Sequence, residues 1–380
     1  MRYTFISGDC HVDLTWLPAD LFTSQAPAQW QEAVPHVVES AKGKRWLADG
    51  ADLGQVAGVG SSGRDPKDLK DDVRVRRMAE TGLYDDGARG IFRPTTPALR
   101  IKDQQLDGIE AEVLYGILGV AGKLKSVDVA TLVLQTYNDW LANFCKSHPE
   151  RFAGVACLPN HDPKAAAEEA RRAAKLGLRG GELVIPNAGK PLYHKDWDVL
   201  WQAASESSLS ISFHSMGIRV RAPEPAEAHR YNLEFNAVNS TMFEIAGAEY
   251  MASIIFSGAC DRFPSFRFVL GECGVAWVPY VLGHMDRHYK ERYHALKLSA
   301  MPSEIWLRQG YTGFQWEPHV APFAHLAGID NIIWGSDFPH QAGLWPDSKK
   351  ILQETLAGLS DEAKRKITCD NAGKLYGFIR

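Results

Sequence analysis

The sequence predicts a (β/α)8 barrel, and three observations support this fold class. Short apolar, β-branched segments alternate with segments of helical periodicity over most of the 380 residues. Such alternation is typical of a parallel sheet with right-handed crossovers, and eight apolar segments suit a closed barrel. Polar residues end several of these segments, at the edge where active sites of such barrels lie. We therefore expect residues 1–380 to form one barrel domain.

The predicted strands are short apolar runs that end at turn or polar residues. The first runs through FISGDCH and ends at His11, and the second is AEVLYG. The predicted strands span residues 5–11, 111–116, 152–159, 179–185, 209–215, 266–273, 310–314 and 331–337. Runs of about four to eight such residues are typical of buried strands.

The segments between the strands carry helical signals. Residues 162–177 begin with an aspartate followed by proline and end at Gly177, which is the pattern of a capped helix. Residues 127–148 place apolar side chains at helical spacing. Further helices are predicted at residues 196–207, 278–290, 320–328 and 348–358, and in a long region after the fifth strand that extends to about residue 259.

Residues 16–100 do not fit this alternation. They are rich in glycine, proline and charge, as in ADLGQVAGVGSSGRDPKDLKDD. We interpret them as a long insertion after the first strand that lies over the barrel mouth, where such insertions often cap substrate pockets. For residues 50–75, a loosely ordered surface excursion is an equal alternative.

Composition and charge restrict the function classes. The chain is 45% hydrophobic and 23% charged, as in an ordinary soluble protein. A formal net charge of -4 and the lack of a Lys/Arg-rich block give no sign of binding to nucleic acid or anionic membranes. No apolar run is long enough to span a bilayer, and MRYTFISGDCH lacks a signal-peptide pattern. Six scattered cysteines without a CxxC pair argue against a zinc-finger site and fit free thiols in a reducing cytoplasm. We expect the partner of such a protein to be a small-molecule substrate.

The polar residues at four strand ends predict a metal site. Asp9 and His11 end the first strand, His214 the fifth, Glu272 the sixth and Asp337 the eighth. Asp9 and His11 are two apart, so both point to the same side of their strand. Imidazole and carboxylate are the ligands that zinc, manganese and iron tolerate, and such an ion can activate water. Glu272 is then a general base, a further ligand, a bridge to a second metal or a carboxylate that orients a histidine.

Three further residues are weaker candidates. His340 lies three residues after Asp337, where it would bind substrate or a second metal, or cap the following turn. His284 lies on the helix after Glu272, where an ordinary helix residue is the alternative to a site role. Arg219 could clamp a substrate carboxylate or belong to a solvated loop.

Several motifs resemble the amidohydrolase-related family. DCH, SFHS, GECG and WGSDFPH resemble those of the branch that contains aminocarboxymuconate semialdehyde decarboxylase and the resorcylate-type decarboxylases. The likeness covers nearly the whole chain and includes LDGIEAEVLYG. It implies that Asp9 and His11 take the place of the family's first-strand HxH or ExH ligands. It also implies that His214 is the fifth-strand ligand, that Asp337 binds metal and its water, and that the protein is a homodimer or higher oligomer.

The chain departs from the family pattern at two positions. The family's decarboxylases use a sixth-strand histidine as acid/base catalyst, and Glu272 stands there instead. The fourth strand offers Glu182 and no lysine, so we expect no carbamate-bridged pair of metals.

These observations admit three functions. The first is a hydrolase that uses metal-activated water on an amide, ester or lactone, with proton transfer by Asp337 and Glu272. The second is a nonoxidative decarboxylase of an aromatic or muconate-like acid, which the absent histidine counts against. The third is a dinuclear iron or manganese oxygenase on the same scaffold. Zinc or manganese is the expected ion for the first two.

Overall fold

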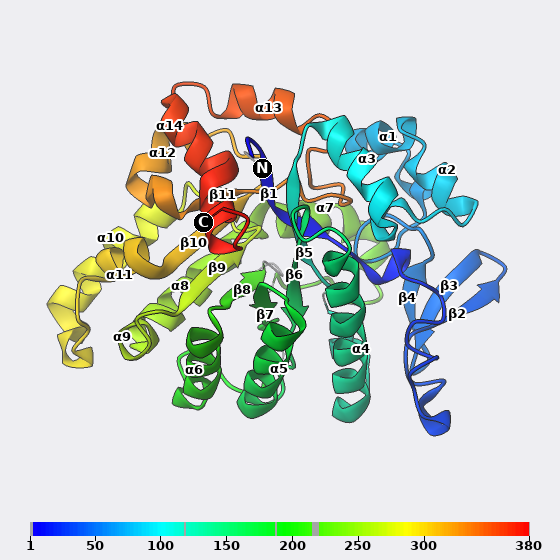
Figure 1. Ribbon diagram of the computed structural model, residues 1–380, viewed down its shortest axis with the longest axis horizontal. Coiled ribbons are helices and arrows are strands. Elements are labelled where there is room, and N and C mark those ends of the chain that lie inside the picture. Colours follow the sequence, from blue (N-terminus) through cyan, green and yellow to red (C-terminus); the bar gives the residue numbers. More distant parts are fainter. Residues whose placement is uncertain (1–2, 118, 187, 215–219, 380) are drawn as a thin grey trace.

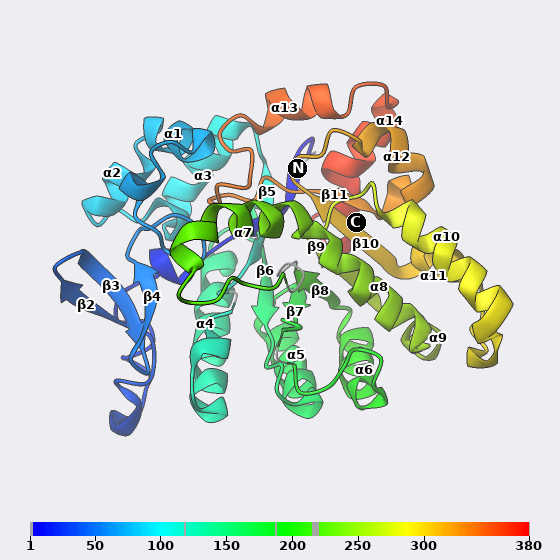
Figure 2. The ribbon, with the colours of Figure 1, turned by 180° about the vertical axis from the view of Figure 1, so that it is seen from behind.

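The computed structural model describes residues 3–117, 119–186, 188–214 and 220–379 and contains an eight-stranded parallel barrel (Figures 1 and 2). Each strand pairs with the next one around the sheet. In order, the strands are β1 (Ile6–His11), β5 (Ala111–Tyr115), β6 (Phe152–Cys157), β7 (Gly180–Glu182), β8 (Ser210–His214), β9 (Arg267–Gly271), β10 (Gly310–Phe314) and β11 (Ile332–Trp334). They correspond to the eight predicted strands, so the predicted fold class is confirmed.

The barrel closes between β1 and the segment that follows β11. The amide of Asp337 donates to the carbonyl of Asp9 at 2.9 Å, and the amide of His11 donates to the carbonyl of Phe338 at 2.8 Å. These bonds hold the carboxyl ends of the first and last strands together. Residues more than 300 positions apart in the chain therefore become neighbours.

Side chains alternate between the two faces of the barrel strands. On β5, Ala111, Val113 and Tyr115 belong to one buried cluster with Val155 of β6. Leu114 belongs to the larger cluster that includes the surrounding helices. This period of two is the expected pattern for a strand that is covered on both faces. Tyr115, the last residue of β5, also belongs to this cluster, and its hydroxyl lies 2.9 Å from the hydroxyl of Ser212 on β8.

Helices cover the outside of the barrel. Asp162 caps α5 by accepting from the amide of Ala165 at 3.2 Å, and Gly177 ends it with a φ of 90°, as predicted. The helices around and after the barrel are α4 (Val127–Lys146), α5 (Pro163–Leu176), α6 (Asp198–Ser207), α8 (Gly247–Phe256), α9 (Ala259–Arg262), α10 (Val278–His288), α11 (Pro302–Gln309), α12 (Val320–Ala327), α13 (Ser348–Thr355), α14 (Asp361–Arg365) and α15 (Asn371–Leu375). Sequence analysis did not predict α11. Within the described ranges, no helix is long and apolar enough to cross a membrane.

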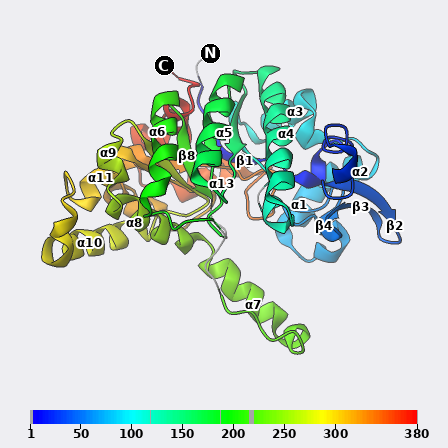
Figure 3. The ribbon, with the colours of Figure 1, turned by 90° about the horizontal axis from the view of Figure 1, so that it is seen from below.

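The long helical region predicted after β8 consists of several helices in the structure. Helix α7 (Ala228–Met242) is followed by a short 3-10 turn, and α8 and α9 then complete the region. Figure 3 shows α7 extending away from the barrel. Its side chains are mostly exposed, including Leu233 at 80%.

The insertion after β1 contains regular structure that the sequence pattern did not reveal. It forms an antiparallel sheet of β2 (His36–Ser40), β3 (Gly43–Ala48) and β4 (Ala51–Gln55), followed by α1 (Val73–Glu80), α2 (Leu83–Ala88) and α3 (Pro97–Asp107). Trp46 is fully buried in this part. The Arg77 guanidinium donates two hydrogen bonds to Asp347, both at 2.9 Å, which ties α1 to the segment after β11. That the insertion limits access to the barrel mouth stays a prediction.

The six cysteines are free thiols, and all are buried. Cys10 lies between Asp9 and His11, and its Sγ is 3.0 Å from the hydroxyl of Ser7. Burial raises the pKa of the Cys10 and Cys273 thiols well above the usual value, so both are neutral. They pack as small apolar side chains next to candidate site residues.

Candidate metal centre

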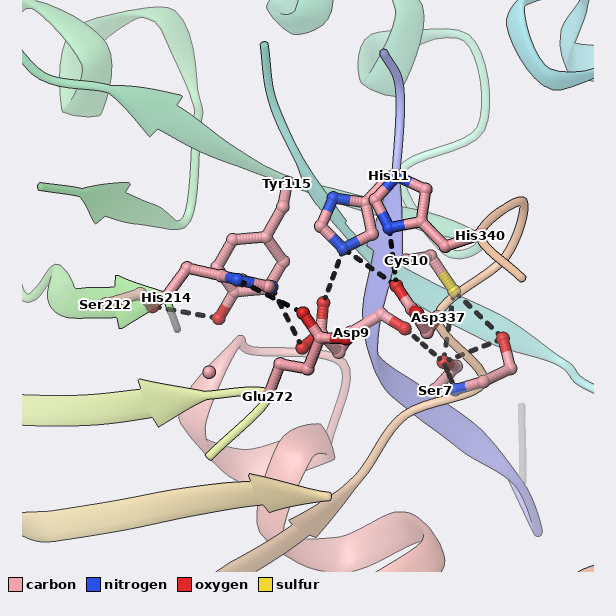
Figure 4. A network of polar contacts seen from close by, with 12 residues as sticks. Ser7, Asp9, Cys10, His11, Tyr115, Ser212, His214, Glu272, Asp337 and His340 are labelled. Atoms are coloured by element: carbon pink, nitrogen blue, oxygen red, sulfur yellow. Dashed lines mark hydrogen bonds and ion pairs between the residues drawn. The ribbon is translucent and has the colours of Figure 1, made fainter. Parts of the chain in front are cut away.

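The ends of β1, β8 and β11 bring four predicted ligands together inside the barrel (Figure 4). The Nε2 atom of His11 lies 3.3 Å from Oδ1 of Asp9 and 3.0 Å from Oδ1 of Asp337. The Nε2 atom of His214 lies 3.4 Å from Oδ2 of Asp9. All four side chains are at most 4% exposed. The candidate ligand atoms of Asp9, His11 and His214 lie within 4.8 Å of one another.

The donor set fits a divalent cation. Among the residues that the structure describes, the carboxylate oxygens of Asp9 and Asp337 and both ring nitrogens of His11 have no partner with hydrogen-bond geometry. The short distances between these side chains are therefore not hydrogen bonds. Their polar atoms face one another across the centre and have no hydrogen-bond partner there. Buried carboxylates without partners are costly unless they are paired or bind a metal. Two imidazoles and two carboxylates are suitable ligands for manganese, iron or zinc.

The charges of the centre shift the pKa values of its members strongly. Burial lowers the pKa of His214, but the carboxylates of Asp9 and Glu272 outweigh burial and raise that pKa to about 10. Burial raises the pKa of Asp9, but the positive charges and close contacts of His214 and His11 hold it well below the usual value. In the absence of a cation, protons therefore supply the positive charge of this centre. A bound metal ion would replace them.

Glu272 lies directly after β9 and faces the centre. Its Oε2 atom is 3.6 Å from Nδ1 of His214, whereas Asp9 contacts the other ring nitrogen, Nε2. Burial and the negative charge of Asp337 raise the pKa of Glu272 to about 8. A protonated carboxyl at this place can serve as a proton donor.

Backbone conformation helps to place two of these carboxylates. Glu272 has a φ of 51° and Asp337 a φ of 56°, which are left-handed values that residues other than glycine rarely adopt. Each costs of order 1–3 kcal/mol, and such strain is concentrated at functional sites. Glu272 follows β9 directly, and Asp337 is the third residue after β11, so both left-handed residues lie just beyond the carboxyl ends of barrel strands.

His340 joins the centre through a residue that sequence analysis missed. Its Nδ1 atom is 3.0 Å from Oδ1 of Asp337, and its Nε2 atom contacts Oδ2 of Asp13 at 2.8 Å. The ring also stacks on His11, with centroids 4.0 Å apart. His11, Asp13 and His340 form a second group of possible metal ligands. The signal for Asp13 was its place in DCHVD, two residues beyond His11 and just past the strand.

The structure does not bring His284 to the centre. His284 is exposed on α10, and the centroid of its ring lies 4.6 Å from that of Tyr280 and 6.0 Å from that of His288. These contacts match the ordinary helix residue that sequence analysis gave as the alternative. Arg219 lies outside the described residues.

Comparison with known proteins identifies the family. The amidohydrolase family model matches residues 9–378, which includes every residue of the centre. The chain belongs to the amidohydrolase family. It is therefore an enzyme, and the resemblance of the DCH, SFHS, GECG and WGSDFPH motifs is confirmed at the family level.

Similar curated proteins are decarboxylases. The chain is 30% identical over 305 residues to a gamma-resorcylate decarboxylase of Polaromonas sp., covering 74% of this chain and 87% of that protein. It is 28% identical over 203 residues to a gamma-resorcylate decarboxylase of Rhodococcus jostii, covering 50% of this chain and 59% of that protein.

Solved structures share the fold. An amidohydrolase of Mycobacterium avium subsp. paratuberculosis superposes with a TM-score of 0.73 at 19% identity, covering 99% of this chain and 100% of that one. A second structure is a dihydroxybenzoic acid decarboxylase of Polaromonas sp. with bound manganese and the inhibitor 2-nitroresorcinol. It superposes with a TM-score of 0.62 at 22% identity and covers 78% of this chain and 90% of that one.

Proposed function

We propose that this amidohydrolase-family enzyme is a divalent-metal-dependent decarboxylase that removes CO₂ from a small aromatic carboxylic acid without oxidation. The observation that carries the proposal is the buried convergence of Asp9, His11, His214 and Asp337. It occurs in a chain whose similar curated proteins include two gamma-resorcylate decarboxylases. Manganese is the proposed ion because it is bound in the similar dihydroxybenzoic acid decarboxylase and in a 5-carboxyvanillate decarboxylase of Novosphingobium aromaticivorans.

Each residue of the centre has a role in this proposal. Asp9, His11, His214 and Asp337 hold the ion, which when bound would supply positive charge for the substrate carboxylate and an adjacent oxygen. Glu272 donates its proton to the ring carbon. The electron pair of the breaking carbon–carboxylate bond forms the new C–H bond, CO₂ leaves, and solvent returns a proton to Glu272.

Hydrolysis, which sequence analysis ranked first, is less well supported than this alternative. That ranking rested on Glu272 standing where related decarboxylases have a histidine. Glu272 follows β9 at the corresponding position, with its Oε2 atom 3.6 Å from Nδ1 of His214, so its carboxyl can supply the acid that the histidine supplies in those decarboxylases. The named curated relatives also support decarboxylation.

Product analysis in D₂O tests the proposal. The manganese-loaded enzyme is incubated without oxygen with 2,6-dihydroxybenzoate and 5-carboxyvanillate as first substrates. We expect CO₂ release and one deuterium on the product ring. Turnover of an ester or lactone panel without CO₂ release would support the hydrolase instead. Turnover that begins only when O₂ is admitted to a parallel sample would support the oxygenase.

A matched pair of histidine variants tests the centre itself. His214→Ala should lower manganese content and abolish activity, because this imidazole is buried against Asp9. His325→Ala removes an exposed histidine on α12 and should change neither quantity. If the two variants had the same manganese content and the same activity, the assigned site would be contradicted.

A further inference from the structure

A cavity of about 260 Å³ opens among the loops that follow β5, β6 and β7. Its walls are mostly apolar and include Ile117, Leu134, Leu158, Val184 and Pro186. An apolar cavity of about 150 Å³ is enough to hold benzene, so this cavity has room for an aromatic ring with a substituent. Apolar pockets with a few polar groups are the usual form of small-molecule sites.

Glu182, the last residue of β7, lies in the wall of this cavity. It is 1% exposed, and neither carboxylate oxygen has a hydrogen-bond partner in the part of the chain that the structure describes. A buried carboxylate in this condition is costly, and a ligand that donates a hydrogen bond would relieve the cost. The unpartnered oxygens therefore indicate a hydrogen-bond donor in the cavity.

Glu182 also lies close to the metal centre. It pairs in register with Ser212 of β8, two residues before His214. Ser212 and His214 both belong to β8, so the end of β7 and the end of β8 lie side by side in the sheet. Because Glu182 belongs to the cavity wall and neighbours the strand that carries His214, the cavity adjoins the proposed reaction site.

Other polar groups of the wall are less suited to recognise a ligand. The amide nitrogen of Asn160 donates to the carbonyl of Val184 at 2.9 Å and so holds the loop after β7. Lys123 is exposed at the cavity. Glu182 is the buried charged group among the described residues of the wall.

We infer that this cavity binds an apolar ring of the substrate and that Glu182 accepts a hydrogen bond from a donor on that ring. The inference rests on the proposed function because it extends the same site. Glu182 acts here as a specificity-determining residue. The enzyme would then prefer a ring that carries a hydroxyl over the same ring with a methyl ether.

Binding of two small probes tests the inference without any turnover. Phenol and anisole fit the same space, but phenol alone carries an O–H donor. Their affinity for the manganese-loaded enzyme is measured by ligand-observed NMR titration, and manganese content is measured on the same samples. Loss of a hydrogen bond to a charged group corresponds to a roughly tenfold or larger change in affinity.

Three variants make the result specific. Glu182→Met keeps the approximate side-chain volume and removes the acceptor, so it should abolish the preference for phenol and leave manganese content unchanged. Val184→Phe should block both probes because Val184 lines the cavity. Val73→Phe adds the same ring at a residue of α1 that is 64% exposed and should leave both affinities unchanged.

The alternative results overturn the inference. Equal binding of phenol and anisole to the wild-type enzyme would remove the role of Glu182 as acceptor. Binding of neither probe, or binding that Val184→Phe does not affect, would exclude the cavity as a ring subsite. Loss of manganese in Glu182→Met would make Glu182 a metal ligand. Each result can be told apart from failure of the proposed function, because that function is judged by CO₂ release.

Discussion

Replacement of Arg100 by methionine should destabilise the protein at the contact between α3 and β5. Arg100 is fully buried, and its Nε atom donates to Glu112 at 2.6 Å. Its Nη1 atom donates to the carbonyl of His11 at 2.9 Å and to that of Pro94 at 3.0 Å. Removal of this guanidinium leaves a buried carboxylate on β5 without its partner. Breaking such a buried pair costs about 3–5 kcal/mol of unfolding free energy.

Guanidinium-induced unfolding followed by circular dichroism measures this cost. Arg100→Met should shift the midpoint strongly, whereas the double variant Arg100→Met/Glu112→Leu should recover part of the loss because no charge is left buried. The control is Arg45→Met, since Arg45 pairs with Asp52 at 2.7 Å but the two side chains are 23% and 51% exposed. That change should cost about 1 kcal/mol or less. If Arg100→Met costs no more than Arg45→Met, the reasoning is refuted.

Three further predictions concern the metal centre. Gly335→Ala should weaken manganese binding about 10–100-fold, because the added Cβ atom would lie 2.4 Å from the Cβ of Asp9 and displace that side chain. Gly283→Ala is the control in the same metal titration, because no atom lies within 4 Å of the Cβ that it adds. Glu272→Gln should lower the rate of CO₂ release more than it lowers manganese content, and equal losses would make Glu272 a ligand. With a pKa of about 10, His214 keeps its proton in the metal-free protein below that pH, so manganese binding at about pH 8 should release at least about one proton per ion. Calorimetry in buffers of different ionisation enthalpy measures that release, and its absence would contradict the raised pKa. The same proton stabilises the metal-free fold fully below about pH 6.5, the ordinary histidine pKa, and that stabilisation should be lost as the pH rises through about 10.

The sequence alone was sufficient for the order of the barrel strands and for naming four candidate ligands that the structure brings together. Apolar runs and helical periodicity are local properties, so all eight strands and the caps of α5 could be predicted. Asp9, His11, His214 and Asp337 could be chosen because active sites of this fold lie at the carboxyl ends of its strands.

Other features depend on residues that meet only when the barrel closes. The position of His340 between Asp337 and Asp13 is one example, and the Arg100–Glu112 pair is another. The sheet of β2, β3 and β4 escaped prediction because its strands are short, partly exposed and rich in charge, so they lack a clear apolar pattern. No local pattern encodes such long-range contacts.

The chain pattern could place Glu182 at a strand end, but it could not show that the carboxylate faces an apolar cavity without a partner. Periodicity reports which side of an element is buried, whereas the shape of a cavity depends on how several loops pack together. The residue types of the candidate ligands and the strand ends that carry them can therefore be predicted from local sequence. The distances between ligands, the shifted pKa values and the space left for a substrate follow from tertiary packing, because each depends on groups contributed by distant parts of the chain.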